Sequence, residues 1–259
     1  MYSRKGNKRR SSKASTKPVK DPGIRLNRYI ASTGLCSRRE ADELISNGLI
    51  TVNGKVVTQL GTKVLPGDSV KYEGKTLKNE KKVYILMNKP KNFVTTVSDP
   101  KAGRNVMDII GSKCPERVYP VGRLDKNTTG VLLFTNDGDL TSRLIHPKYK
   151  KKKIYHIFLN RNLMRSDLVK IANGMELEDG FIKPDAVHYV DENDKSQVGI
   201  ELHSGKNRIV RRIFESLDYK IKKLDRVYFA GLTKKGLQRG QWRYLTDKEI
   251  SMLKMNAFD

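Results

Sequence analysis

Two short apolar runs restrict the fold of this chain more than any other feature of its sequence. One is VYILM at residues 83–87, which leads into the turn residues Asn88-Lys89-Pro90, and the other is VLLF at residues 131–134. An uninterrupted apolar run of this length, bounded by polar turn residues, is typical of a buried strand. The sequence therefore predicts buried strands at 83–87 and 131–134, the second of them covered on both faces.

Length and composition exclude several classes of protein. The 259 residues are enough to bury a substantial core and suggest one large or two modest domains. No apolar run approaches the roughly 18 residues of a membrane span, so no membrane partner is expected. The two cysteines, Cys36 and Cys114, cannot form a disulfide framework or a Cys-rich zinc site, and the four histidines lack metal-ligand spacing. No bound metal is therefore expected.

Positive charge is the strongest compositional signal. The chain has 52 Lys and Arg against 28 Asp and Glu, a formal net charge of +24. This excess favours a polyanionic partner. Residues 1–20 contain eight of these cations and no acidic residue, and they have too few apolar side chains to fold. We therefore predict a disordered basic tail at residues 1–22, which either solubilises the chain or tethers it to RNA.

A small basic module is predicted at residues 23–80. Its sequence contains a helical apolar pattern from Leu26, then Ser37-Arg38-Arg39-Glu40, which is a capping box that opens a second helix. Asn53-Gly54 between short alternating segments predicts a β-hairpin. Arg38 and Arg39 would be unfavourable in the first turn of a helix unless a phosphate lies beside them, although simple solvent exposure is the alternative.

The module resembles the RNA-binding domain first known from small-subunit ribosomal protein S4. The resemblance rests on RLNRYIASTGLCSRREADELISNGLITVNGKVV, which begins at Arg25, and on the PGDSV that follows. It implies binding of structured RNA, with Arg38 and Arg39 as candidate RNA-binding residues. It implies no chemistry by itself.

The larger piece, residues 81–259, contains a candidate reactive carboxylate. Asp125 lies on a polar loop directly before the second buried run and two residues after Arg123. A carboxylate held near fixed cations stays ionised, as a nucleophile or a general base must. A loop Asp that makes an Asx-turn to its own backbone is the ordinary alternative.

Two later segments supply further candidates. Tyr155 lies in an alternating strand at 153–159, where it either packs in the core or stacks on an extruded base. Lys206 precedes a helix whose apolar face contains Ile209, Val210, Ile213, Phe214 and Leu217, with Arg208, Arg211 and Arg212 opposite. A cation at that position suggests a nearby anion, either the Asp125 carboxylate or a phosphate, unless it is simply exposed.

Together these segments resemble the RsuA-type family of ribosomal pseudouridine synthases, most closely the B-like branch of its large-subunit enzymes. The similarity spans about residues 24 to 250, and Ile209 departs from the Gln or Glu usual in the family. The matching motifs are GRLD at 122–125, LLFTNDG at 132–138, KIY at 153–155, GKNR at 205–208, VRR at 210–212 and GQWR at 240–243.

The resemblance implies a site and a reaction. It implies that Asp125 is the catalytic aspartate, that Tyr155 packs on the target base, and that Lys206 is the basic partner of Asp125. Arg123 would hold the RNA open around a flipped-out uridine, and Arg208 and Arg212 are candidate RNA-binding residues. The implied reaction turns uridine into pseudouridine in ribosomal RNA, large-subunit RNA being favoured, and needs no cofactor.

The fold expected is α+β: a small α/β RNA-binding module, then a catalytic domain with a mixed, largely antiparallel sheet and flanking helices. A cytoplasmic monomer is expected because the sequence contains no targeting segment and no sign of an obligate oligomer. A non-catalytic rRNA-binding or ribosome-assembly factor is the main alternative, since the positive net charge and the small RNA-binding module suit it as well as they suit an enzyme. A metal-dependent nuclease would need clustered carboxylates, for which Asp137 and Asp139 are a poor basis.

Overall fold

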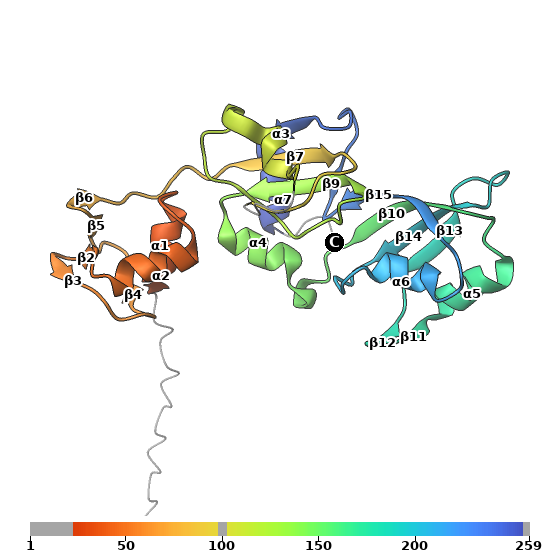
Figure 1. Ribbon diagram of the computed structural model, residues 1–259, viewed down its shortest axis with the longest axis horizontal. Helices are drawn as coiled ribbons and strands as arrows, with labels where there is room; N and C mark the ends of the chain where they lie inside the picture. Colours follow the sequence, from red (N-terminus) through yellow and green to blue (C-terminus); the bar gives the residue numbers. More distant parts are fainter. Residues whose placement is uncertain (1–22, 98–102, 256–259) are drawn as a thin grey trace, which may run out of the picture. The chain divides into compact units, whose positions relative to one another are not determined.

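The computed structural model describes residues 23–97 and 103–255 (Figure 1). The predicted basic tail at 1–22 lies outside these described residues. The chain divides into two compact units at the Lys78–Asn79 junction, two residues before the boundary that the sequence suggests.

The smaller unit packs two helices on a four-stranded antiparallel sheet with the strand order β3-β2-β5-β6, and β1 pairs separately with β4. Its core residues are Leu26, Ile30, Ala41, Ile45, Ile50, Val64 and Val70. The elements are β1 (Ile24–Arg25), α1 (Leu26–Ser32), α2 (Arg38–Ser46), β2 (Ile50–Val52), β3 (Lys55–Val56), β4 (Lys63–Val64), β5 (Val70–Tyr72) and β6 (Lys75–Thr76).

Two local predictions for this unit are confirmed. The Glu40 N–H donates to Ser37 Oγ at 3.2 Å, and the Ser37 N–H donates to Glu40 Oε2 at 2.6 Å, which completes the capping box of α2. Asn53 and Gly54 have φ values of 50° and 80° and join β2 to β3 in a tight hairpin. Arg38 and Arg39 are exposed on the first turn of α2.

The larger unit is built on a mixed sheet with the strand order β13-β14-β10-β15-β9-β7-β17. β9 and β15 are parallel, and the other strand pairs of this sheet are antiparallel, which confirms the predicted fold class. The strands are β7 (Tyr84–Lys89), β8 (Tyr119–Pro120), β9 (Thr128–Thr135), β10 (Lys153–Leu159), β11 (Met175–Leu177), β12 (Gly180–Ile182), β13 (Ala186–Tyr189), β14 (Gln197–Leu202), β15 (Ile221–Phe229), β16 (Leu232–Thr233) and β17 (Trp242–Tyr244).

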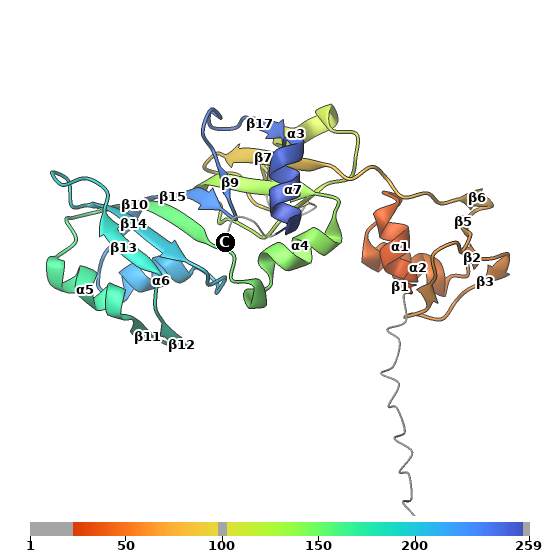
Figure 2. The same cartoon turned by 180° about the vertical axis from the view of Figure 1, so that it is seen from behind.

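Helices cover both faces of this sheet (Figures 1 and 2). At β7 and β9, α4 and α7 cover one face and α3 covers the other, so both strands are buried throughout, as predicted. At β10, β14 and β15, α5 and α6 pack on the sheet. The helices are α3 (Val106–Ile110), α4 (Gly138–Ile145), α5 (Arg165–Asn173), α6 (Ile209–Glu215) and α7 (Asp247–Met255).

The helix predicted after Lys206 is α6, and it buries the four predicted apolar residues from Ile209 to Phe214. It ends at Glu215, so Leu217 lies beyond it. Within the described residues, no helix has the length and apolar character needed to cross a membrane.

Candidate active site

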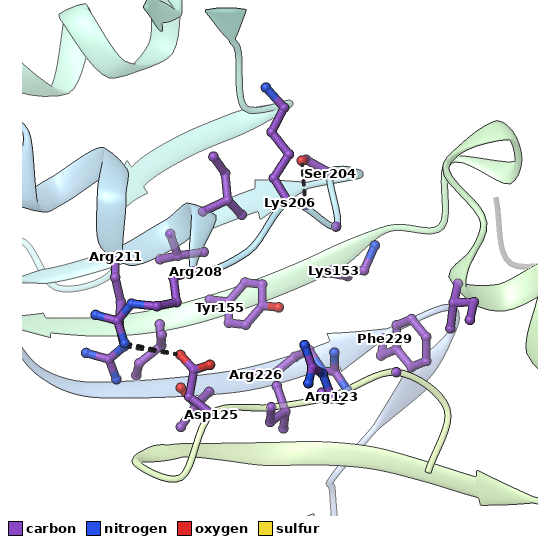
Figure 3. Close-up of a pocket in the computed structure, with 18 of the residues that line it drawn as sticks. Arg123, Asp125, Lys153, Tyr155, Ser204, Lys206, Arg208, Arg211, Arg226 and Phe229 are labelled. Atoms are coloured by element: carbon purple, nitrogen blue, oxygen red, sulfur yellow. Dashed lines mark hydrogen bonds and ion pairs between the residues drawn. The ribbon is translucent and has the colours of Figure 1, made fainter. Parts of the chain in front are cut away.

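A pocket opens where the start of β9 meets β10, β15 and the loop before α6 (Figure 3). It brings together five residues that the sequence singled out: Arg123, Asp125, Tyr155, Lys206 and Arg208. Arg212 does not line it, and Arg38 and Arg39 belong to the smaller unit. Its other polar lining residues include Thr128, Lys153, Ser204, Arg211 and Arg226.

A buried lysine holds the loop that carries Asp125. Lys89, at the end of β7, is fully buried, and its ammonium donates to the carbonyl oxygens of Asp125 (3.2 Å), Lys126 (3.3 Å), Thr128 (2.9 Å) and Pro90 (3.1 Å). The Thr128 N–H also donates to the Asp125 carbonyl oxygen at 3.0 Å. Burial lowers the pKa of Lys89 to about 8, an effect that the Asp125 carboxylate opposes.

The Asp125 carboxylate lies near two arginines of the α6 region. Arg211 Nε is 3.5 Å from Asp125 Oδ2, and Arg208 Nη1 is 3.9 Å from the same oxygen. Both contacts are ion pairs and not hydrogen bonds. Arg211 Nε is buried and has no hydrogen-bond partner, and the 3.9 Å from Arg208 is too long for a hydrogen bond. The Asp125 side chain is 41% exposed, so it remains accessible from the pocket.

The expected pairing of Lys206 with Asp125 is wrong. Lys206 Nζ donates to the backbone carbonyl of Asp179 at 2.8 Å and lies 3.5 Å from the Asp179 carboxylate. Asp179 lies in the β11–β12 turn, which packs near α6 and so attracts this cation instead. Arg212 makes a bidentate pair with the same carboxylate at 2.6 and 2.9 Å, which lowers the pKa of Asp179 to about 2. The cations beside the Asp125 carboxylate are Arg211 and Arg208.

A cluster that sequence reasoning missed lies around Tyr155. Tyr155 on β10 is opposite Arg226 on β15, and a register shift beside this pair places Lys153 opposite Phe229. The shift is a β-bulge that puts Arg226 and Phe229, three residues apart, on the same pocket wall. The Arg226 guanidinium lies over the Phe229 ring, 4.6 Å from its centre. The sequence around Arg226 reads as an ordinary alternating strand, so it does not predict that this arginine lines the pocket.

Of the two basic side chains in this cluster, Arg226 is buried and Lys153 is half-buried. Arg226 is 3% exposed, and its Nε donates to the Val131 carbonyl at 2.9 Å. Lys153 donates to the carbonyls of Lys151 and His203, each at 3.0 Å. Burial and the nearby Arg226 charge lower the pKa of Lys153 to about 8.

Three buried polar atoms on the pocket wall have no hydrogen-bond partner: Thr128 Oγ1, Arg211 Nε and Arg226 Nη2. Buried polar groups are nearly always paired in native proteins, and a molecule bound in the pocket is one source of the missing partners. Among the described residues, no group of three or more His, Cys, Asp or Glu is placed to hold a metal ion. The pocket combines one accessible carboxylate, a phenol and several cations.

Comparisons with known proteins match both units. Residues 83–216 match the family of RNA pseudouridylate synthases, and residues 24–70 match the S4 domain. The chain is 40% identical to the ribosomal large subunit pseudouridine synthase B of Bacillus subtilis, over 90% of this chain and 96% of that protein. It is 34% identical to the dual-specificity RNA pseudouridine synthase RluF of Escherichia coli K12, over 89% and 78%.

A solved structure is similar over the same extent. A crystal structure of a pseudouridylate synthase superposes with a TM-score of 0.65 at 26% identity, over 89% of this chain and 99% of that one.

Proposed function

The chain belongs to the RsuA/RluB-type RNA pseudouridine synthases with an N-terminal S4 domain, as its motifs indicated, and we propose that it isomerises a uridine of large-subunit (23S) ribosomal RNA. The enzyme class is an isomerase. The choice of RNA is supported by 40% identity to a relative named for the large ribosomal subunit and by the net charge of +24. Such a substrate locates the activity in the cytoplasm.

Asp125 is the proposed catalytic group, and the observation that carries this is its position in the pocket. Its carboxylate is accessible, lies 3.5 Å from Arg211 and 3.9 Å from Arg208, and belongs to a loop that Lys89 anchors. The reaction breaks the N1–C1′ bond of uridine, turns the base, and joins C5 to C1′, while the C5 proton is lost and N1 gains a proton. Asp125 either attacks C1′ or takes the 2′ proton. No electrons are exchanged with a second reactant, so the chemistry balances without a cofactor.

Tyr155 and Arg123 are proposed to hold the flipped nucleotide. Tyr155 offers the flat face on which a uracil can pack, and Arg123 lies beside the Asp125 loop at the pocket (Figure 3). Removing a base from its stack costs a few kcal/mol, which contacts to neighbouring phosphates can offset. Lys206 now has a different proposed role, because it pairs with Asp179: it fixes the loop before α6.

RNA contacts outside the pocket are proposed for the exposed arginines Arg38 and Arg39 of the small unit and Arg208 at the pocket. Arg212 is less suited to a phosphate, because the Asp179 carboxylate already occupies its guanidinium. Contacts of this kind make RNA affinity fall with rising salt.

The test is tritium release from transcripts labelled at uridine C5. Large-subunit and small-subunit rRNA and a tRNA are assayed separately with wild type and Asp125→Asn. Wild type should release tritium from the large-subunit transcript, and Asp125→Asn should release none while binding that RNA as tightly. Release only from another RNA would overturn the substrate, and normal turnover by Asp125→Asn would overturn the role of Asp125. Tight binding without release from any RNA, assembled particles included, would favour the non-catalytic binding factor.

A further inference from the structure

Arg226 is a buried cation that the proposed reaction leaves without a role. It is 3% exposed, and its Nη2 atom has no hydrogen-bond partner in the described chain although it lines the pocket. Arginine keeps its charge in proteins, so this guanidinium cannot avoid the cost of burial by losing a proton. A ligand that supplies an acceptor to Nη2 would offset the cost of burying this charge.

No carboxylate neutralises Arg226 within the described residues. Its neighbour Asp225 points to the other face of β15, where it accepts from Thr129 at 2.9 Å and pairs with Lys234 and Arg239. Arg226 donates to the Val131 carbonyl, lies over the Phe229 ring and interacts with the Tyr155 hydroxyl, and none of these groups is an anionic carboxylate. Burial lowers the pKa of Arg226, and the adjacent Tyr155 hydroxyl opposes the shift. A positive charge therefore stands unbalanced in the pocket wall.

The position of Arg226 relative to Asp125 suggests what it meets. Tyr155 lies between the Asp125 carboxylate and Lys153, and Arg226 lies directly beside it as its cross-strand partner (Figure 3). On the proposed function, the ribose C1′ of the target is at Asp125 and its uracil lies against Tyr155. The carbonyl oxygens of that uracil then face the guanidinium of Arg226.

We propose that Arg226 donates a hydrogen bond to a carbonyl oxygen of the target uracil and stabilises the negative charge that the base carries while it is detached from the ribose. The inference rests on the proposed function and deepens it. When the N1–C1′ bond breaks, its electron pair stays on N1 and is delocalised onto O2 and O4. No proton passes from Arg226: the guanidinium stabilises the charge until C5 attacks C1′, after which the C5 proton is lost to solvent and N1 takes up a proton.

The same donor favours uracil over cytosine. Uracil presents an acceptor oxygen at position 4, whereas cytosine presents an amino group, and a guanidinium has no acceptor to receive it. A backbone phosphate is a poorer occupant, because it would have to enter a wall in which Arg226 is almost fully buried. An exposed cation at the pocket suits a phosphate better, as Arg208 does with its 46% exposed side chain.

The experiment combines variants of Arg226 with single-atom changes in the target uracil. After tritium release has identified the target, RNA fragments are made with uridine, 2-thiouridine or 4-thiouridine at that position, because sulfur is a weak acceptor. Single-turnover conversion is followed by nuclease digestion and chromatography for wild type, Arg226→Gln, Arg226→Lys and the control Arg239→Gln. Arg239 pairs with Asp225 and does not line the pocket.

Arg226→Gln should slow conversion of the uridine fragment by about 10²–10³-fold, the loss typical of one donor to a developing anion, with unchanged RNA affinity. Sulfur at the contacted position should slow wild type but leave Arg226→Gln no slower, and Arg226→Lys should recover part of the rate. Arg239→Gln should behave as wild type with every fragment.

Three results would overturn the inference while the enzyme stays active. The first two are a folded Arg226→Gln with the wild-type rate, and sulfur effects that are equal in wild type and Arg226→Gln. The third is a loss of RNA affinity in Arg226→Gln together with a salt dependence of binding whose slope is reduced by about one, because that marks a phosphate contact. If Arg226→Gln does not fold, the sulfur effects in wild type and Arg226→Lys decide, and equal effects would overturn it. Failure of the proposed function is different, because wild type itself would then convert no fragment.

Discussion

Replacing Lys89 by Met should loosen the loop that carries Asp125 while keeping most of the side-chain volume. The ammonium of Lys89 is fully buried and donates to four backbone carbonyls, three of which belong to residues 125–128. An ammonium has three hydrogens, so at least one of these contacts is shared. Met fills a similar space without a donor, and the carbonyls lose the partner that fixes the loop to β7.

The magnitude follows from these contacts. A fully buried carbonyl left without a donor costs about 1–3 kcal/mol. This cost applies in full to Thr128 and in part to the half-buried contacts at Pro90, Asp125 and Lys126. Removing the buried charge offsets part of this loss of stability, because desolvating an ammonium costs several kcal/mol. Loop carbonyls that turn toward water recover more. We expect the free energy of unfolding to fall by about 2–4 kcal/mol, and turnover to fall about 10²-fold if Asp125 moves by about 1 Å.

Denaturant unfolding and single-turnover tritium release measure the two effects. Lys91→Met is the matched control, since it makes the same substitution at an exposed lysine two residues away. The control should unfold and turn over as wild type does. A Lys89→Met protein with the stability and turnover of Lys91→Met would refute the anchoring role of Lys89. Lost stability with full turnover would show that Lys89 supports the fold without positioning Asp125.

Three further outcomes are expected. Gly130→Ala should destabilise the chain by more than about 3 kcal/mol in denaturant unfolding, because Gly130 has φ +105° and an added Cβ would lie 2.1 Å from the Arg226 carbonyl oxygen, whereas Gly138→Ala meets nothing within 4 Å. The free energy of unfolding should rise with pH between about 8 and 10.5, because Lys89 and Lys153 are neutral there in the folded chain but still protonated when unfolded, and Lys153→Met should flatten that rise. Ser37→Ala should remove the cap of α2 and cost about 1 kcal/mol, seen as faster amide exchange in α2, and unchanged exchange would contradict the capping role.

Features that depend on residues close together in the sequence could be predicted from it. The buried strands β7 and β9, the Ser37–Glu40 capping box and the Asn53-Gly54 hairpin each follow from a periodicity or a short motif. The apolar face of α6 is predictable for the same reason. The family is predictable because its motifs are numerous and specific, and the matches over residues 83–216 and 24–70 confirm it.

Contacts between distant side chains could not be predicted in the same way. Lys206 and Arg211 are both cations close to the start of α6, and spacing alone does not say which one reaches Asp125. The outcome depends on Arg208, whose left-handed backbone (φ 48°) starts the helix, and on the β11–β12 turn, whose Asp179 attracts Lys206. Arg226 enters the pocket wall beside Phe229 because of a bulge that no local pattern announces.

The two carboxylates beside α6 differ in a way that bears on which of them can react. Arg212 grips Asp179 through two hydrogen bonds of 2.6 and 2.9 Å and lowers its pKa to about 2, so both of its oxygens are occupied. Asp125 has ion pairs at 3.5 and 3.9 Å and no such hydrogen bond. A carboxylate must offer a free lone pair to attack C1′ or take a proton, and tight pairing would withdraw it. The looser contacts of Asp125 with Arg211 and Arg208 therefore suit the proposed reaction, because the carboxylate oxygens stay available.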